Sequence, residues 1–345
     1  MNKTSRMMFL QYVESDAHRL DTLGRFGGAK NLRCAARRLR SYLLSIGKKD
    51  ISFPRLKPFF FGCFEDWLRQ QGVLRNTSSS YMRSLHAAFN QAVREGVAAN
   101  GTAEGLSRLC ENPFINVYCG VDKTAKRAVG KNSIRSIQQM DIQVRLTALY
   151  KRQGKRITGK YFESALRQLE LTRDLFIFSF CMRGMAFVDM AFLRKSDIID
   201  GHVLYARRKT QQWINVRIEP MMQEILERWH TENSYVFPLL TEEHNEAVAY
   251  QEYQNQLTLY NRRLKTIGRM LGGINLTSYV SRHSWASAAH AENIPLSIIS
   301  QSMGHDSELT TRIYLQELDH KVIDNTNGQL LSVVFDGKRN RTSVK

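Results

Sequence analysis

The chain has 345 residues, of which 43% are hydrophobic and only 6 are proline, a composition that excludes a disordered protein and a length that favours about two domains. The formal net charge is +18, and residues 1–125 carry +9 of it (19 Lys and Arg minus 10 Asp and Glu). A basic excess in both halves suits two lobes that bind one polyanion such as a nucleic acid. Basic side chains that neutralise phosphates release the counterions condensed on them, and this release favours binding. A generally basic surface is the alternative.

Apolar runs and cysteines exclude further classes of protein. The longest apolar run, Leu175 to Met182, ends at Arg183, well short of the roughly 20 residues that a membrane span needs. The N-terminus lacks the apolar core of a signal peptide, so we expect no membrane contact and a cytoplasmic location. The 5 cysteines form no CxxC pair, and we expect reduced thiols, with no zinc site and no disulfides.

The N-terminal part of the chain predicts helices. Residues 31–44 place apolar side chains at helical spacing beside a stripe of arginines, namely Arg33, Arg37 and Arg40. A second helix is expected from about Phe59 to Gln71, ending at Gly72. A third, capped by Asn76 or Thr77, ends at Gly96. The third helix carries polar side chains that form either a face for a DNA groove or a solvated surface: Arg83, His86, Asn90 and Arg94.

Residues 118–131 have two glycines, three lysines, one arginine and little periodicity, which is typical of a linker. Helical patterns resume over 134–150 and 161–182. A β-branched and aromatic stretch then alternates on either side of a polar turn at Thr210, which predicts a hairpin. Helical patterns continue from there to about Leu331, and no internal repeat is visible.

Residues 277–319 carry the strongest chemical signal. Leu296, Ile299 and Met303 predict a helix that Gly304 terminates, and Asp306 or Ser307 can cap the next one. Three reactive side chains then lie at or near helix ends: Arg282, His305 and Tyr314. Because helix N-termini offer N–H groups and partial positive charge, these side chains could share a phosphate.

This segment resembles the C-terminal box of the tyrosine recombinase, or phage integrase, family. That box reads His-x-x-Arg-His, then Leu-Gly-His about twenty residues later, then a nucleophilic tyrosine. Here Arg282 and His283 are followed by Met303-Gly304-His305, and Tyr314 lies nine residues beyond His305. Tyr279 stands where the family has its first histidine, as in one branch of the family.

The resemblance extends upstream. Arg183 and Asp189 match the arginine and the acidic residue of the family's first box, although six residues separate them where about three are usual. Lys209 matches the catalytic lysine. The resemblance implies a mainly α fold with a small β-hairpin, closing as a two-domain clamp. Residues 1–117 would form a helical, SAM-like core-binding domain and residues 118–131 a linker. Residues 132–335 would form an integrase-type catalytic domain, and residues 336–345 a basic tail.

The same resemblance implies a reaction. Tyr314 would attack a DNA phosphate to give a 3′-phosphotyrosine, with Arg183 and Arg282 on the phosphate oxygens. Lys209 would protonate the leaving 5′-oxygen, and His305 would bind the phosphate or orient Tyr314. Tyr279 would hydrogen-bond the phosphate. No metal, ATP or other cofactor is expected.

The implied partners are double-stranded recombination sites and further copies of the chain. Family members form a tetramer on two duplexes, in which the apolar tail packs on the next subunit; folding back on its own domain is the alternative. Accessory DNA-bending proteins are a further possibility, and inversion or excision fits somewhat better than integration. The residues expected to contact DNA are Arg33, Arg37, Arg40, Arg75, Arg83, Asn90, Lys123, Lys126 and Arg127.

Several alternatives stay open from the sequence. Arg183 could form a buried ion pair with Asp189. Either Arg207 or Arg208 could take the place of Lys209, and His283 could be purely structural. Other functions that would fit are a DNA-binding protein of the same fold without catalysis, a type IB topoisomerase-like enzyme and, more distantly, a helix-turn-helix regulator.

Overall fold

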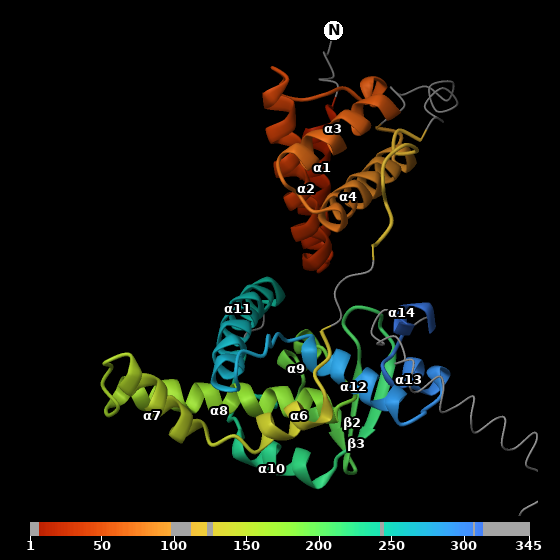
Figure 1. Cartoon of the computed structure of the whole chain (residues 1–345). Helices are drawn as coiled ribbons and strands as arrows, with labels where there is room; N and C mark the ends of the chain where they lie inside the picture. Colours follow the sequence, from red (N-terminus) through yellow and green to blue (C-terminus); the bar gives the residue numbers. More distant parts are fainter. Residues whose placement is uncertain (1–6, 98–111, 123–126, 242–244, 306–307, 313–345) are drawn as a thin grey trace, which may run out of the picture. The chain divides into compact units, whose positions relative to one another are not determined.

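The computed structural model describes residues 7–97, 112–122, 127–241, 245–305 and 308–312. The chain divides into two compact units, residues 1–124 with 243–251 and residues 125–242 with 252–345 (Figure 1). No helix within the described ranges is long and apolar enough to cross a membrane. Several sequence predictions fall outside these ranges: those for Cys110, Lys123, Lys126, Asp306, Ser307, Tyr314 and the tail.

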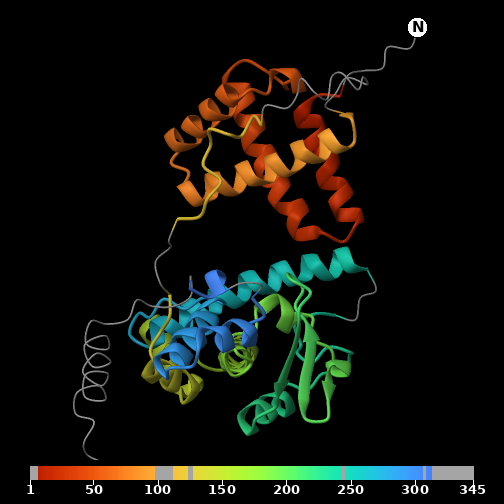
Figure 2. The same ribbon diagram turned by 90° about the vertical axis from the view of Figure 1, so that its right-hand side faces the viewer.

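The first unit is a helical bundle. Its elements are α1 (Phe9–Thr22), α2 (Phe26–Ser45), a 3-10 turn (Phe53–Arg55), α3 (Pro58–Gln70) and α4 (Arg75–Arg94). Helix α1 packs on α2, and α2 on α4, around an aromatic core (Figure 2). The rings of Phe9, Phe61 and Phe89 meet edge to face at this core. The arginine stripe predicted on α2 is exposed, and the apolar positions of the same helix are buried.

The start of α4 differs from the prediction. The helix begins at Arg75, with Leu74 at the N-cap position and no side-chain cap. Asn76 uses its amide on the segment that follows the bundle: it donates to Asp122 O at 3.0 Å and accepts from Asp122 N at 2.7 Å. The cap expected at Asn76 or Thr77 was therefore wrong, because a contact distant in sequence engages the Asn76 side chain.

The second unit is mainly helical with one small antiparallel sheet, the predicted fold class. Its first helices are α6 (Lys131–Gln138), α7 (Ile142–Arg152), α8 (Lys160–Cys181) and α9 (Phe187–Ala191). After the 3-10 turn Lys195–Asp197 come β1 (Ile198–Ile199), β2 (His202–Ala206) and β3 (Trp213–Arg217), in the order β1-β2-β3. The remaining helices are α10 (Pro220–Arg228), α11 (Glu246–Met270), α12 (Val280–Ala291), α13 (Leu296–Ser302) and α14 (Glu308–Arg312). The first residues of α11, up to 251, are grouped with the first unit.

Helix α8 organises the second unit. Helices α6, α7, α10 and α12 all pack against it (Figure 1). Its C-terminal half carries the apolar run seen in the sequence, with Phe176 and Phe178 fully buried. The single helix predicted over 134–150 is in fact two, because Asp141 caps α7 by accepting from Val144 N at 2.9 Å.

Candidate active site

A tight turn at the end of α8 positions Arg183. Arg183 and Gly184 both have positive φ angles, of 56° and 76°. A Cβ at residue 184 would lie 2.7 Å from Arg282 Cα, so only glycine allows this approach. A left-handed conformation is uncommon for a residue such as Arg183, and strain of this kind clusters at functional sites.

Arg282, in the first turn of α12, joins three segments of the chain. Its side chain is buried, with Nη1 donating to Gly184 O at 2.7 Å and Nη2 to Met303 O at 2.7 Å. Nη2 also lies 2.8 Å from His305 Nε2. One guanidinium therefore holds the turn after α8 and the end of α13 against α12.

His305 is held as a neutral ring. Because a guanidinium only donates, His305 Nε2 accepts from Arg282 and the proton sits on Nδ1, which donates to Thr311 Oγ1 at 2.8 Å. Burial lowers the pKa of His305 to about 3, and the charges of Arg282, Arg207 and Lys209 act in the same direction. His305 is therefore uncharged at neutral pH, and both of its ring nitrogens are engaged in hydrogen bonds.

This pKa predicts a pH dependence of stability. Between about pH 6.5, where histidine titrates in an unfolded chain, and about pH 3, the unfolded state binds a proton that folded His305 excludes. The free energy of unfolding should therefore fall as the pH drops through this window, by at most about 2 kcal/mol at pH 5 and by less after screening by solvent at the half-buried ring. In urea unfolding, the free energy of unfolding should fall less between about pH 7 and pH 5 for His305→Gln than for wild type. An equal fall in the two proteins would contradict the lowered pKa of His305.

The β2–β3 turn forms the other wall of the site. Arg207 is buried there, and its Nη1 donates to Gly304 O. Its Nε lies 3.9 Å from Asp189 Oδ2, while Arg208 N donates to Asp189 Oδ1 at 2.9 Å. Burial raises the pKa of Asp189, and the hydrogen bond from Arg208 and the nearby arginines oppose this rise. The turn is thus joined to α9 on one side and to the loop after α13 on the other.

Gly304 follows α13 with a φ of 61°, as predicted from its position after the helix. A Cβ there would lie 2.7 Å from Arg207 Cδ and 3.0 Å from Ile214 Cδ1. The absence of a side chain lets Arg207 reach the loop that carries His305. Beside it, a hollow of about 490 Å³ opens, lined by residues that include Gln212, Ser300 and His305.

The three cations of the β2–β3 turn differ in what they contact. Arg207 is engaged by Gly304 and Asp189, and the guanidinium of Arg208 lies 4.0 Å from the ring centroid of Phe192. Lys209 is exposed and has no hydrogen bond or ion pair with the described residues. Of the three side chains, Lys209 is the one without a described partner.

Arg183 likewise has no hydrogen bond or ion pair with the described residues, and Asp189 lies against Arg207 instead. Tyr279 occupies the N-cap position of α12 and is 44% exposed. His283 is buried one residue after Arg282. Arg183 thus adjoins Gly184, which Arg282 contacts, and the charge of Lys209 acts on His305, the partner of Arg282. Tyr279 precedes Arg282 by three positions, and Tyr314 follows the last described residue of α14 by two.

The expected DNA contacts in the first unit fall into two groups. Arg33 and Arg40 form ion pairs with Asp21 and Glu14 of α1. Arg75 lies 3.8 Å from the Tyr118 ring centroid and 3.5 Å from Asp122. The other described members are exposed and have no ion pair with the described residues: Arg37, Arg83, Asn90 and, in the second unit, Arg127.

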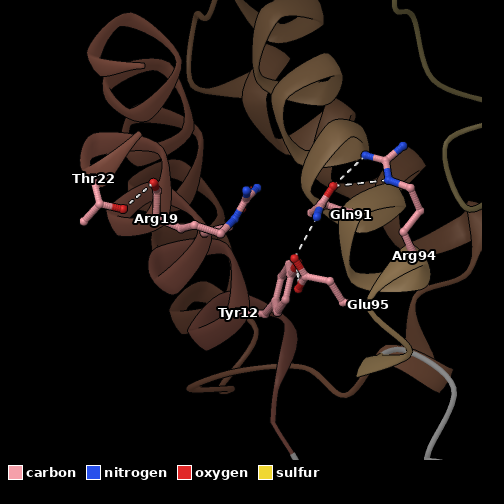
Figure 3. Close-up of polar contacts among 7 residues, drawn as sticks. Tyr12, Arg19, Thr22, Gln91, Arg94 and Glu95 are labelled. Atoms are coloured by element: carbon pink, nitrogen blue, oxygen red, sulfur yellow. Dashed lines mark hydrogen bonds and ion pairs between the residues drawn. The ribbon is translucent and has the colours of Figure 1, made fainter. Parts of the chain in front are cut away.

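The end of α4 is fastened to α1. Arg94 donates twice to Gln91 Oε1, at 2.7 and 3.2 Å, and Gln91 Nε2 donates to Glu95 Oε1 at 2.7 Å (Figure 3). Tyr12 OH donates to Glu95 Oε2 at 2.7 Å. Arg94 is thus engaged in an intramolecular network. The ring of His86 is engaged elsewhere, because it stacks on Phe114 with ring centroids 4.7 Å apart.

Two family models match the chain. A phage integrase SAM-like domain matches residues 8–104, and the phage integrase family matches residues 148–321. No curated protein matches the sequence. Together the two matched segments include Arg183, Lys209, Arg282, His305 and Tyr314.

Solved integrase structures share the fold. The integrase of transposon Tn1549, in complex with a circular intermediate DNA, aligns with a TM-score of 0.56 at 13% identity, over 94% of this chain and 99% of that one. A lambda integrase dimer bound to a COC′ core site aligns with a TM-score of 0.52 at 13% identity, over 98% of this chain and 80% of that one. A lambda integrase tetramer bound to a Holliday junction aligns with a TM-score of 0.51 at 13% identity, over 92% of this chain and 80% of that one. The two-domain integrase architecture predicted from the sequence is confirmed.

Proposed function

Because the chain belongs to the phage integrase family of tyrosine recombinases, we propose that it is a site-specific recombinase that cuts and rejoins double-stranded DNA through Tyr314. The observation that carries the proposal is the position of Arg282. Its buried guanidinium contacts the Arg183 turn, the end of α13 and His305 at once. A phosphate placed there would meet two arginines on a preorganised frame that His305 braces.

The reaction exchanges one ester for another. Tyr314 attacks phosphorus, the bond to the 5′-oxygen breaks, and a 3′-phosphotyrosine and a 5′-hydroxyl result. Arg183 and Arg282 neutralise the developing charge on the nonbridging oxygens. Lys209 gives a proton to the leaving 5′-oxygen. Neutral His305 orients Tyr314, and to hydrogen-bond the phosphate it would carry its proton on Nε2 instead of Nδ1. Attack by a 5′-hydroxyl of a partner duplex reverses the step, so no cofactor is needed.

The hydroxyl of Tyr279 takes the place of the first histidine. It stands at the N-cap position of the helix that carries Arg282, and its side chain is partly exposed. A phenol with a pKa near 10 donates a hydrogen bond at neutral pH but accepts no proton. We assign Tyr279 a phosphate contact without a role in proton transfer.

The domain assignment is part of the proposal. Residues 1–117 would form the core-binding domain and 132–335 the catalytic domain, with 118–131 as linker and 336–345 as a basic tail. The lambda integrase tetramer on a Holliday junction supports synapsis by four copies. Strand exchange would invert or excise DNA more readily than integrate it, in the cytoplasm, with or without DNA-bending partners.

A covalent trap tests the function. Wild-type protein is incubated without metal on nicked duplexes that carry the repeats flanking the gene, so that the cleaved strand is lost and the adduct accumulates. We expect a slowly migrating species on a denaturing gel. Mass spectrometry should show that the DNA is linked to the peptide that contains Tyr314. Binding of the site without an adduct would favour a DNA-binding protein of this fold. An adduct, together with relaxation but no recombination of a supercoiled plasmid that carries the same sites, would favour a topoisomerase-like enzyme.

A further inference from the structure

The connection between α7 and α8 concentrates positive charge away from the active site. We call residues 151–160 the basic turn. No acidic residue occurs between Asp141 and Glu163. The five cations of the basic turn, all exposed, are Lys151, Arg152, Lys155, Arg156 and Lys160.

The basic turn has a defined backbone. Gly154 ends α7 with a φ of 63°, and Lys155 N donates to Tyr150 O at 2.9 Å, which closes the helix end. The rings of Tyr150 and Phe162 meet edge to face with centroids 5.5 Å apart, joining the two helices at the base of the turn. The cations are therefore displayed from a fixed position.

Nothing in the described part of the chain neutralises these charges. None of the five cations forms an ion pair with a described carboxylate, whereas Arg33 and Arg40 on α2 each do. Like charges this close together repel each other. A bound polyanion relieves that repulsion, and the cations of the turn release the counterions condensed on it.

Helix α8 fixes the distance from the basic turn to the active site. The helix starts at Lys160, within the turn, and ends at Cys181, next to the Arg183 turn (Figure 1). Its 22 residues span about 33 Å at 1.5 Å per residue. For a duplex that runs parallel to α8, at about 3.4 Å per base pair, this length corresponds to about ten base pairs.

We propose that the basic turn binds the phosphate backbone of the DNA flank about ten base pairs from the cleaved phosphate. The inference rests on the proposed function, because it takes the bound polyanion to be the duplex held at the active site. Phosphate contacts of this kind position a protein without reading sequence. The basic turn would therefore extend the footprint of each subunit beyond the bases it recognises.

Flank length tests the proposal. Lys151, Arg152, Lys155 and Arg156 are changed together to glutamine, and binding is measured on a duplex that ends about five base pairs beyond the cleaved phosphate and on one that extends about twenty. On the long duplex we expect the variant to bind about tenfold more weakly than wild type, with a salt slope smaller by about three to four. On the short duplex the two proteins should bind alike.

A charge-preserving variant provides the matched control. Exchanging Lys for Arg and Arg for Lys at the same four positions should retain wild-type binding on both duplexes. Equal loss on both duplexes, or no loss on either, would overturn the proposal. Adduct formation by wild type and the glutamine variant on the short duplex is read in parallel, so that a missing adduct identifies a failure of the proposed function instead.

Discussion

Replacing Tyr314 with phenylalanine is expected to lower the rate of adduct formation on nicked DNA by at least about a thousandfold, because the only change is loss of the attacking oxygen. Tyr279→Phe should lower the same rate by about a hundredfold at most, since it removes one hydrogen-bond donor to the phosphate. The measurement is single-turnover adduct formation on a denaturing gel.

The described tyrosines near the site are poor substitutes for Tyr314. Tyr205 is 5% exposed, and burial raises its pKa, so its oxygen is neither accessible nor ionised. Tyr279 is exposed but stands at the N-cap position of α12. Binding of intact DNA should be unchanged in Tyr314→Phe, which separates chemistry from affinity. An adduct that survives in Tyr314→Phe and disappears in Tyr279→Phe would reverse the two assignments.

Local signals in the sequence predicted much of the fold. The arginine stripe of α2, the hairpin around Thr210 and the helix end at Gly304 all follow from short-range periodicity or from the conformational freedom of glycine. Helix α1 was not located within the helical N-terminal part. Its buried Phe9, Val13 and Ala17 are spaced four residues apart, so the signal was present in the sequence.

The frame around the active site depends on contacts distant in sequence. The sequence predicted Arg282 and His305 as partners of a phosphate but could not show that Arg282 also holds Gly184 O and Met303 O. The bracing role of Arg207 was also missed. A signal existed, because the period-two burial of Val203 and Tyr205 in β2 continues to residue 207 and places this arginine on the buried face.

The second large effect is expected for Arg282→Lys. Lysine keeps the charge but carries its three donors on a single nitrogen, so it cannot replace a planar fork that spans Gly184 O, Met303 O and His305 Nε2. The buried carbonyls would lose partners and the phosphate would lose a fixed guanidinium. We expect adduct formation to slow by about a thousandfold or more.

A matched change at a partly buried arginine away from the site separates lost chemistry from lost stability. Arg173, on α8, has its Nε 2.9 Å from Asp174 Oδ1, and its Nη1 donates to Met140 O at 2.8 Å. Arg173→Lys should lower the free energy of unfolding by about 1–3 kcal/mol, as Arg282→Lys also should, yet leave adduct formation within a few-fold of wild type below the melting temperature. If both variants lost activity in proportion to their stability, Arg282 would be a structural arginine and the phosphate site would have to be placed elsewhere. If only Arg282→Lys lost it, the fork that holds three chain segments together would also be the one that binds the phosphate.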